Sequence, residues 1–190
     1  MSKNRLEAFS DGVIAIIITI MVLELKVPHG NDFAALTSLL PVFLGYVLSF
    51  IYLGIYWNNH HHMLHTCHKV TGPILWANLH LLFWLSLIPF ATGWLGENPL
   101  VTAPAVLYGL ILSLAAMAFL ILQTAIIASE GQESQLKRAV GKDLKGKLSL
   151  VCYLVALFSA FKWQWVAEIL YVTVALIWLV PDRRIENIVD

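Results

Sequence analysis

The sequence predicts an all-α integral membrane protein with six transmembrane helices, and three observations support this fold class. First, 59% of the 190 residues are hydrophobic, only 13% are charged and the mean hydropathy is +0.76, which is too apolar for an ordinary soluble domain. Second, six stretches approach the ~20 apolar residues with which a helix crosses a bilayer. Third, Lys and Arg are concentrated in the connections that six spans would place on one side of the membrane.

The six predicted helices follow one another with short polar connections. The last two are separated where Lys162 and Gln164 interrupt an otherwise continuous apolar region. Tryptophans flank this break, as aromatic residues do at a membrane surface. Pro89, followed by Phe90, predicts a kink in the third helix. The predicted ranges are 9–27, 36–57, 72–95, 100–128, 148–161 and 164–180.

The distribution of basic residues predicts that both termini are cytoplasmic. With the amino terminus inside, only Lys26 and Lys162 of the 12 Lys and Arg residues would lie outside. The connection at 129–147 is the one long loop that we expect, and it is too short for a separate domain, so residues 1–190 form one domain. The ten basic residues predicted on the cytoplasmic side are Lys3, Arg5, Lys69, Lys137, Arg138, Lys142, Lys145, Lys147, Arg183 and Arg184.

Composition and missing motifs exclude several functions. The formal net charge is +0 and the pI is 7.1, so no basic field calls for nucleic acid. Cys67 and Cys152 lack C-x-x-C partners, and no thiol metal site follows. The sequence has no hydrolase, metalloprotease or phosphate-loop signature and no pair of intramembrane aspartates, so we do not expect an enzyme. It also lacks a T-V-G-Y-G filter, and any potassium selectivity would have to arise in another way.

The first apolar segment presents two distinct sides. Between Gly12 and Leu23 the only polar side chain is that of Thr19. Gly12, Ile16, Thr19 and Leu23 are spaced by four, three and four residues, which places them on one helical face. Two interpretations are open: the face packs against neighbouring helices, or copies of it surround an axis and form a hydrophobic constriction, which requires an oligomer.

Ser10 and Asp11 lie on the opposite side of the same helix. A carboxylate inside a membrane segment is a candidate functional group because its insertion costs energy. Near the end of the helix, however, Asp11 can serve as a hydrogen-bonding brace. Residues at the inner ends of the second and third spans could be its partners, and we favour this bracing role over ion binding. The proposed hydrogen-bond partners of Ser10 and Asp11 are Trp57, His60 and Asn78.

A histidine run between His60 and His68 gives a competing function. His61, His65 and His68 follow the i, i+4, i+7 spacing of one helical face, and three convergent imidazoles can bind zinc. No Asp or Glu lies between Phe33 and Gly96 to support them, so we favour a polar cap. The alternative is a proton-coupled or metal-ion transporter that uses Asp11 and the His60–His68 cluster. A membrane scaffold without permeation is a third possibility.

The R-x-x-x-F-S-D motif at residues 5–11 resembles the signature of the transmembrane protein 175 family, which comprises endolysosomal potassium channels and bacterial relatives. By helix count the resemblance covers the whole chain, although the last three spans carry no matching motif. Further matching residues are Trp57-x-x-His60, Asn78 and Pro89-Phe90.

The resemblance implies a potassium-permeable leak channel without a P-loop, whose pore is lined by the first helix. In such a channel Ile16 would form the constriction, Thr19 would contribute to selectivity, and Leu23 would form the next hydrophobic layer outward. Bacterial members of the family resemble homotetramers, so four copies of this chain would assemble around the pore.

The resemblance also implies a setting and a bracing motif. A prokaryotic plasma membrane would hold the channel, potassium and possibly other monovalent cations would be its permeants, and lipids and copies of the same chain would be its partners, with no cofactor. The pore helix would be braced by a set of seven residues. These are Arg5, Phe9, Ser10, Asp11, Trp57, His60 and Asn78.

Overall fold

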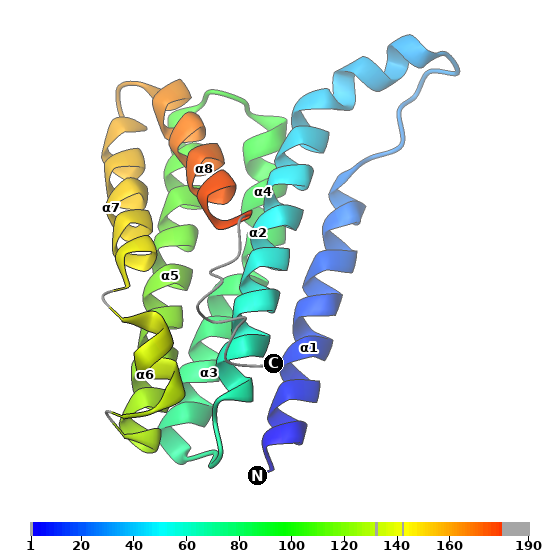
Figure 1. The fold of residues 1–190 in the computed structure, drawn as a ribbon. Helices are drawn as coiled ribbons and strands as arrows, with labels where there is room; N and C mark the ends of the chain where they lie inside the picture. The colour runs from blue at the N-terminus through cyan, green and yellow to red at the C-terminus, as the bar shows by residue number, and fades with distance from the viewer. Residues whose placement is uncertain (1, 132, 142, 180–190) are drawn as a thin grey trace.

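A computed structural model describes residues 2–131, 133–141 and 143–179, and every regular element in these ranges is helical (Figure 1). The longer helices run roughly alongside one another as a bundle. In chain order the elements are α1 Lys3–Ile20, η1 Met21–Glu24, η2 Phe33–Leu39, α2 Leu40–His65, α3 Gly72–Ser86, α4 Ile88–Glu97, α5 Thr102–Glu130, α6 Gln135–Val140, α7 Leu144–Ser159 and α8 Gln164–Leu179.

Within the described ranges, four helical segments are long and apolar enough to cross a membrane, which supports the predicted all-α membrane class. They correspond to the first four predicted spans. The fifth and sixth predicted helices also exist, as α7 and α8, but each has only 16 residues. Since this is short of the usual ~20, the count of six spans remains a prediction. The four segments are Lys3–Glu24, Phe33–His65, Gly72–Glu97 and Thr102–Glu130.

Several predicted boundaries were wrong. The first helix begins at Lys3 rather than Phe9, and the second ends at His65 rather than Trp57. Apolar length marks only the part of a helix inside the bilayer, whereas backbone hydrogen bonding continues through polar residues. Near the predicted kink at Pro89 the structure divides the third predicted helix into α3 and α4, which are separated at Leu87. Residue 180 and three of the basic residues counted above lie outside the described residues, namely Lys142, Arg183 and Arg184.

The loop predicted at 129–147 contains the short helix α6 and the first turn of α7. Gly131 and Gly141, both with positive φ, follow the ends of α5 and α6. Ser134 caps α6 by accepting a hydrogen bond from the Lys137 amide, 3.3 Å away. These caps provide partners for backbone groups that have none at a helix terminus. The polar connection can therefore contain a short helix, which a search for long apolar stretches does not detect.

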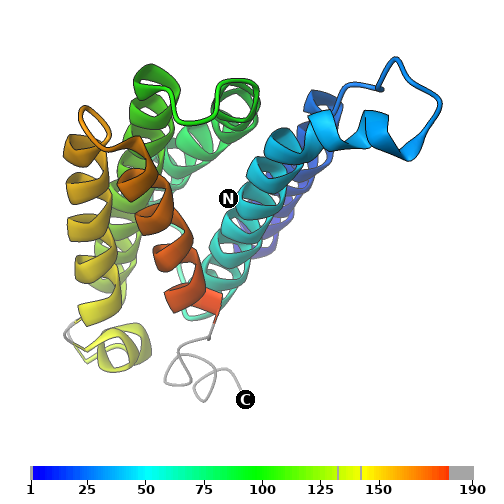
Figure 2. The same cartoon turned by 90° about the horizontal axis from the view of Figure 1, so that it is seen from above.

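Contacts between helix ends show which ends lie together at each end of the bundle. At one end, Lys3 Nζ donates to the carbonyl oxygen of His65 at 2.7 Å, and His68 Nδ1 lies 2.7 Å from Glu130 Oε2. At the other end Lys26 pairs with Glu97. The end holding Lys3 therefore also holds the carboxyl ends of α2 and α5, as the predicted topology requires. Figure 2 shows α1 and α7 at opposite edges of the bundle.

Candidate functional site

One side of α1 is buried against the bundle. Its residues are spaced by three or four positions, as a single packed face of a helix requires. Ser10 is 0% exposed, and the apolar members of the face are almost as completely covered. They pack against α2, α3 and α4. This buried face consists of Leu6, Ser10, Ile14, Ile17 and Met21.

Two of the predicted pore residues, Ile16 and Thr19, lie on the other side of α1, and the third, Leu23, follows in the 3-10 helix η1, where the α-helical spacing no longer applies. Ile16 is 61% exposed and Leu23 is 74% exposed. Thr19 is exposed between them, and its hydroxyl donates to the carbonyl oxygen of Ile16 at 2.9 Å. A Cβ built at Gly12 would meet nothing within 4 Å. The described part of the chain leaves this stripe uncovered, so its function as a pore lining is still a prediction that depends on other subunits.

A chain of buried hydrogen bonds joins α1, α2 and α3. His60 Nε2 donates to Asn78 Oδ1 at 2.7 Å, and Asn78 Nδ2 donates to Ser10 Oγ at 3.0 Å. The Ser10 hydroxyl then donates to the carbonyl oxygen of Leu6 at 2.8 Å. The direction of the first bond follows from the acceptor character of the amide oxygen. Ser10, His60 and Asn78 are at most 1% exposed, so each polar group in this apolar region depends on the others.

A second hydrogen bond braces α1 closer to the surface. Trp57 Nε1 donates to Asp11 Oδ1 at 3.0 Å, and the Trp57 ring stacks on His61 with centroids 6.4 Å apart. The structure thus brings together five of the seven residues predicted to brace α1. Arg5 and Phe9 instead lie on the exposed side of α1, and their bracing role remains a prediction.

The histidines do not form the predicted single face. Because α2 ends at His65, His68 lies beyond the helix, where the i+7 spacing no longer applies. Among the described residues no group of three or more His, Cys, Asp or Glu side chains could hold a metal ion. His60 is engaged with Asn78, while His68 faces Glu130. No convergent site for the alternative transporter function is present in the described part of the chain.

Glu130 is an important residue that the sequence did not identify. Its carboxylate accepts hydrogen bonds from the His68 amide at 2.7 Å and from the Lys69 amide at 3.4 Å, in addition to its contact with the His68 ring. The end of α5 thereby holds the connection between α2 and α3. The two sides of this contact are about sixty positions apart in the sequence, and only the polarity of the His68 region hinted that a partner was needed.

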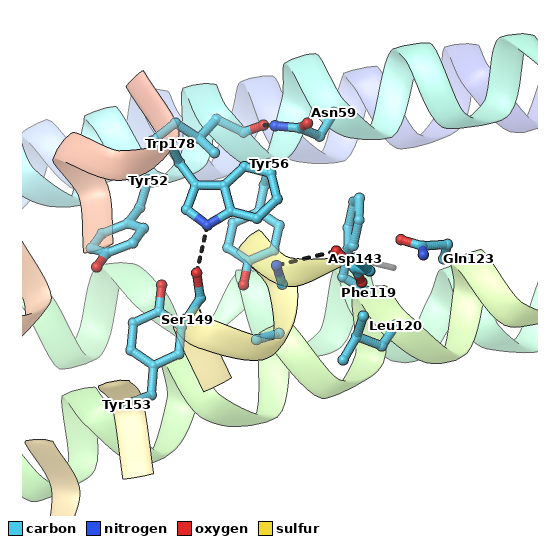
Figure 3. A pocket seen from close by; sticks show the side chains of 13 residues that line it. Tyr52, Tyr56, Asn59, Phe119, Leu120, Gln123, Asp143, Ser149, Tyr153 and Trp178 are labelled. Carbon is cyan, nitrogen blue, oxygen red and sulfur yellow. Dashed lines mark hydrogen bonds between the residues drawn. The ribbon is translucent and has the colours of Figure 1, made fainter. Parts of the chain in front are cut away.

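A small cavity lies away from α1, between α2, α5, α7 and α8 (Figure 3). Its volume is about 60 Å³, and five of its thirteen lining residues are aromatic. Trp178 closes part of it and donates from Nε1 to Ser149 Oγ at 2.6 Å. No α1 residue lines it, so it is separate from the exposed stripe. Representative lining residues are Tyr52, Tyr56, Phe119, Ser149, Tyr153 and Trp178.

Comparisons with known proteins place this architecture in a family. The family model described as "Endosomal/lysosomal potassium channel TMEM175" matches residues 5–89, the part of the chain that contains the bracing network. A protein from Chryseobacterium sp. (strain P1-3) that is named a potassium channel is 55% identical over 187 residues, which are 98% of this chain and 97% of that protein.

Two more distant relatives agree with this match. The human protein named endosomal/lysosomal proton channel TMEM175 is 35% identical over 103 residues, which are 48% of this chain and 20% of the human protein. The crystal structure of a lysosomal potassium-selective channel TMEM175 homolog from Chamaesiphon minutus superposes with a TM-score of 0.83 at 28% identity, covering 95% of this chain and 97% of that one. The chain therefore belongs to the TMEM175 family of membrane-spanning channels.

Proposed function

We propose that this protein is a potassium-permeable leak channel, a homotetramer whose pore is lined by α1 without a P-loop. The observation that carries the proposal is the exposed stripe of Gly12, Ile16 and Thr19 on α1, followed by the exposed Leu23 on η1, while the opposite side of α1 is fixed by buried hydrogen bonds. The names of bacterial relatives as potassium channels support the choice of permeant. Potassium passes through as the conducted ion, and no cofactor is required.

In the proposed pore, aliphatic and hydroxyl layers alternate along the axis. Rings of Ile16 and Leu23 side chains from four subunits narrow the path until water within it is unstable, which makes a barrier to ions. Thr19 lies between them, about 4.5 Å along the helix from Ile16 by the usual rise per residue. Because its hydroxyl proton is directed at the Ile16 carbonyl, its oxygen lone pairs remain to face a partly dehydrated cation.

Each subunit in this proposal crosses a prokaryotic plasma membrane six times, with both termini cytoplasmic. The short helices α7 and α8 complete the count, and tilt, local thinning of the bilayer or snorkelling side chains can accommodate a short span. Trp163 and Trp165, which are 51% and 57% exposed, lie at the turn between these helices, where interfacial aromatics are expected. The whole chain then acts as one channel domain, in contact with lipid and with its own copies.

The bracing network keeps the stripe pointed at the axis. Ser10, held through Asn78 and His60, fixes the rotation of α1 at its inner end, and Asp11 adds the contact with Trp57. If α1 turned about its own axis by the angle between successive residues, about 100°, Ile16 would no longer face the pore axis. We assign Phe9 and Arg5 to the contact with the neighbouring subunit, where their exposed side chains would be covered.

The test is potassium flux in proteoliposomes with Ile16→Asn, because a polar side chain should wet the constriction. Wild-type protein should conduct, and we expect the variant to conduct several-fold faster. Ile169→Asn on α8 is the matched control, since Ile169 is 56% exposed and distant from α1. A control on the buried face of α1, such as Met21, would be unsuitable because this side chain is 0% exposed and its replacement would disturb the fold. Unchanged flux in Ile16→Asn together with altered flux in Ile169→Asn would show that the pore is elsewhere.

A further inference from the structure

The cavity between α2, α5, α7 and α8 is lined by a buried hydroxyl that has no hydrogen-bond partner in the described part of the chain. This hydroxyl belongs to Tyr56 of α2, which is 8% exposed and lies within a segment apolar enough to cross the membrane. The Tyr56 ring packs edge-on against Phe119 of α5, with centroids 6.0 Å apart. Figure 3 shows the two rings among the side chains that line the cavity. A hydroxyl buried at membrane depth without a partner is unfavourable, so the cavity is the place to look for one.

Two other buried tyrosines of the bundle show the usual arrangement. Tyr108 is 1% exposed, and its hydroxyl lies 2.9 Å from Ser49 Oγ. Tyr171 is 0% exposed, and its hydroxyl donates to the carbonyl oxygen of Ala105 at 3.0 Å. Neither of these tyrosines lines the cavity. The open hydroxyl of Tyr56 is therefore a property of the cavity and not of buried tyrosines in general.

Two amide side chains also line the cavity. Gln123 of α5 is only partly exposed, and its amide forms no hydrogen bond with any residue that the structure describes. Asn59 of α2 donates from Nδ2 to the carbonyl oxygen of Ile55 at 2.8 Å, and its amide oxygen can still accept. Together with Tyr56, these side chains offer both donors and acceptors to a molecule inside the cavity.

The polar groups gather toward one end of the cavity. On α2, Tyr52, Tyr56 and Asn59 are spaced by four and three residues, which places them on one face, and Asn59 is the nearest of the three to the end of the helix at His65. On α5, Gln123 lies four residues beyond Phe119 in the direction of the same end of the bundle. An occupant therefore meets hydroxyl and amide groups at this end and aromatic rings deeper in the bundle.

The size of the cavity selects among possible occupants. Its volume is about 60 Å³, whereas pockets for drug-sized ligands measure roughly 300–1,000 Å³. A water molecule takes up about 30 Å³ in the liquid, which leaves room for about two of them. A cation is disfavoured because Lys145 Nζ already lies 5.7 Å from the centroid of the Trp178 ring, which borders the cavity. Water both donates and accepts, as a hydroxyl and an amide require.

We propose that this cavity is an internal hydration site, in which a small cluster of water molecules bridges Tyr56 of α2 to Gln123 of α5. The amide oxygen of Asn59 provides a third partner for the cluster. Bound water of this kind completes buried polar groups and forms part of a folded structure. No residue of α1 lines the site, so it is separate from the proposed pore and does not depend on conduction.

The test is X-ray hydroxyl-radical labelling of the full-length protein in detergent, read by mass spectrometry. Irradiation converts water into hydroxyl radicals, which oxidise the side chains that this water touches. Tyr56 should be oxidised several-fold faster than Tyr108, the matched internal control, because both side chains are buried and only Tyr56 lines the cavity. Equal rates for the two tyrosines in the wild type would show that the cavity is dry, and the proposal would fail.

Variants on α5 separate cavity water from radicals that arrive from the bulk solvent. Ala116→Leu adds carbon atoms at a residue that lines the cavity, so it should expel the water and lower the oxidation rate of Tyr56 to that of Tyr108. Gln123→Leu removes a polar partner with little change in size and should give a smaller decrease. Ala128→Leu is the matched control, because Ala128 is exposed and does not line the cavity; it should keep the wild-type rate.

An oxidation rate of Tyr56 that stays at the wild-type value in both Ala116→Leu and Gln123→Leu would mean that bulk radicals reach this ring, and it would overturn the proposal. Slow oxidation of Tyr56 together with a co-purified organic molecule in native mass spectra would assign the cavity to a different ligand. Because labelling is measured without flux, a protein that conducts potassium with a dry cavity, or the reverse, separates this proposal from the channel function.

Discussion

The two sides of α1 have similar compositions, each with branched aliphatic residues and one hydroxyl, but their surroundings differ. On the buried side the hydroxyl of Ser10 belongs to a chain of hydrogen bonds through Asn78 to His60. On the exposed side the hydroxyl of Thr19 bonds only to its own helix, at the carbonyl oxygen of Ile16. The buried side of α1 makes its packing contacts and hydrogen bonds within the subunit. The other has its apolar surface uncovered.

This difference separates folding from function along one helix. Changes on the buried side should act on the stability of the subunit, because they leave buried polar groups without partners. Changes on the exposed side should act on assembly and conduction, because within one subunit they remove little contact. The predictions below follow this contrast, from the largest expected effect on the folded subunit to the smallest.

The largest loss of stability is expected for Asn78→Ala. It removes both hydrogen bonds at the centre of the network and leaves the His60 ring nitrogen buried without its acceptor. We expect a loss of about 1–3 kcal/mol, measured as a lower midpoint of thermal unfolding in detergent. Asn98→Ala is the control, because the partly exposed Asn98 side chain, directly after α4, donates to the carbonyl oxygen of Trp94 in that helix. Equal unfolding midpoints for the two variants would contradict a central role for Asn78.

A smaller effect is expected where Asp11 meets Trp57. This hydrogen bond involves a tryptophan that is 46% exposed, and water can replace part of what is lost. In a double-mutant cycle with Asp11→Ala and Trp57→Phe, we expect a coupling energy of about 1 kcal/mol. The single variants should yield fewer intact oligomers without a change of ion preference. Additive losses of stability would show that Asp11 and Trp57 are not coupled, and normal oligomers with altered selectivity would assign Asp11 to the ion path.

The smallest effect on the subunit is expected for Thr19→Val, which keeps the shape of the side chain and removes its hydroxyl. Stability should change by less than about 0.5 kcal/mol, as is usual for exposed positions. The ratio of potassium to sodium flux should nevertheless fall, because the proposed oxygen layer is lost. Thr173→Val on α8, where the threonine also bonds within its own helix, provides the control. If both variants keep the wild-type ratio, Thr19 has no part in selectivity.

Much of this molecule was predictable from the sequence. Apolar length identified the membrane class and the separate helices α7 and α8, while the spacing of Gly12, Ile16 and Thr19 indicated a common face of α1. Leu23 lies in the 3-10 helix η1, so the α-helical spacing does not extend to it. These features are local, since they depend on helical periodicity within one segment. The partners proposed for Ser10 and Asp11 also agree with the structure, because the number and length of the spans limit which polar residues can meet at the inner end.

Other polar contacts were decided only by the tertiary structure. It connects Glu130 with the His68 region and places His68 beyond the end of α2, away from His61 and His65. It also buries Leu136 of α6, which leaves Lys137 and Arg138 exposed. Hydrophobic periodicity is expressed in neighbouring residues and can be read from the chain. The partner of a buried hydrogen-bonding group is chosen by the packing of distant segments, because desolvation makes the bond necessary without specifying which residue supplies it.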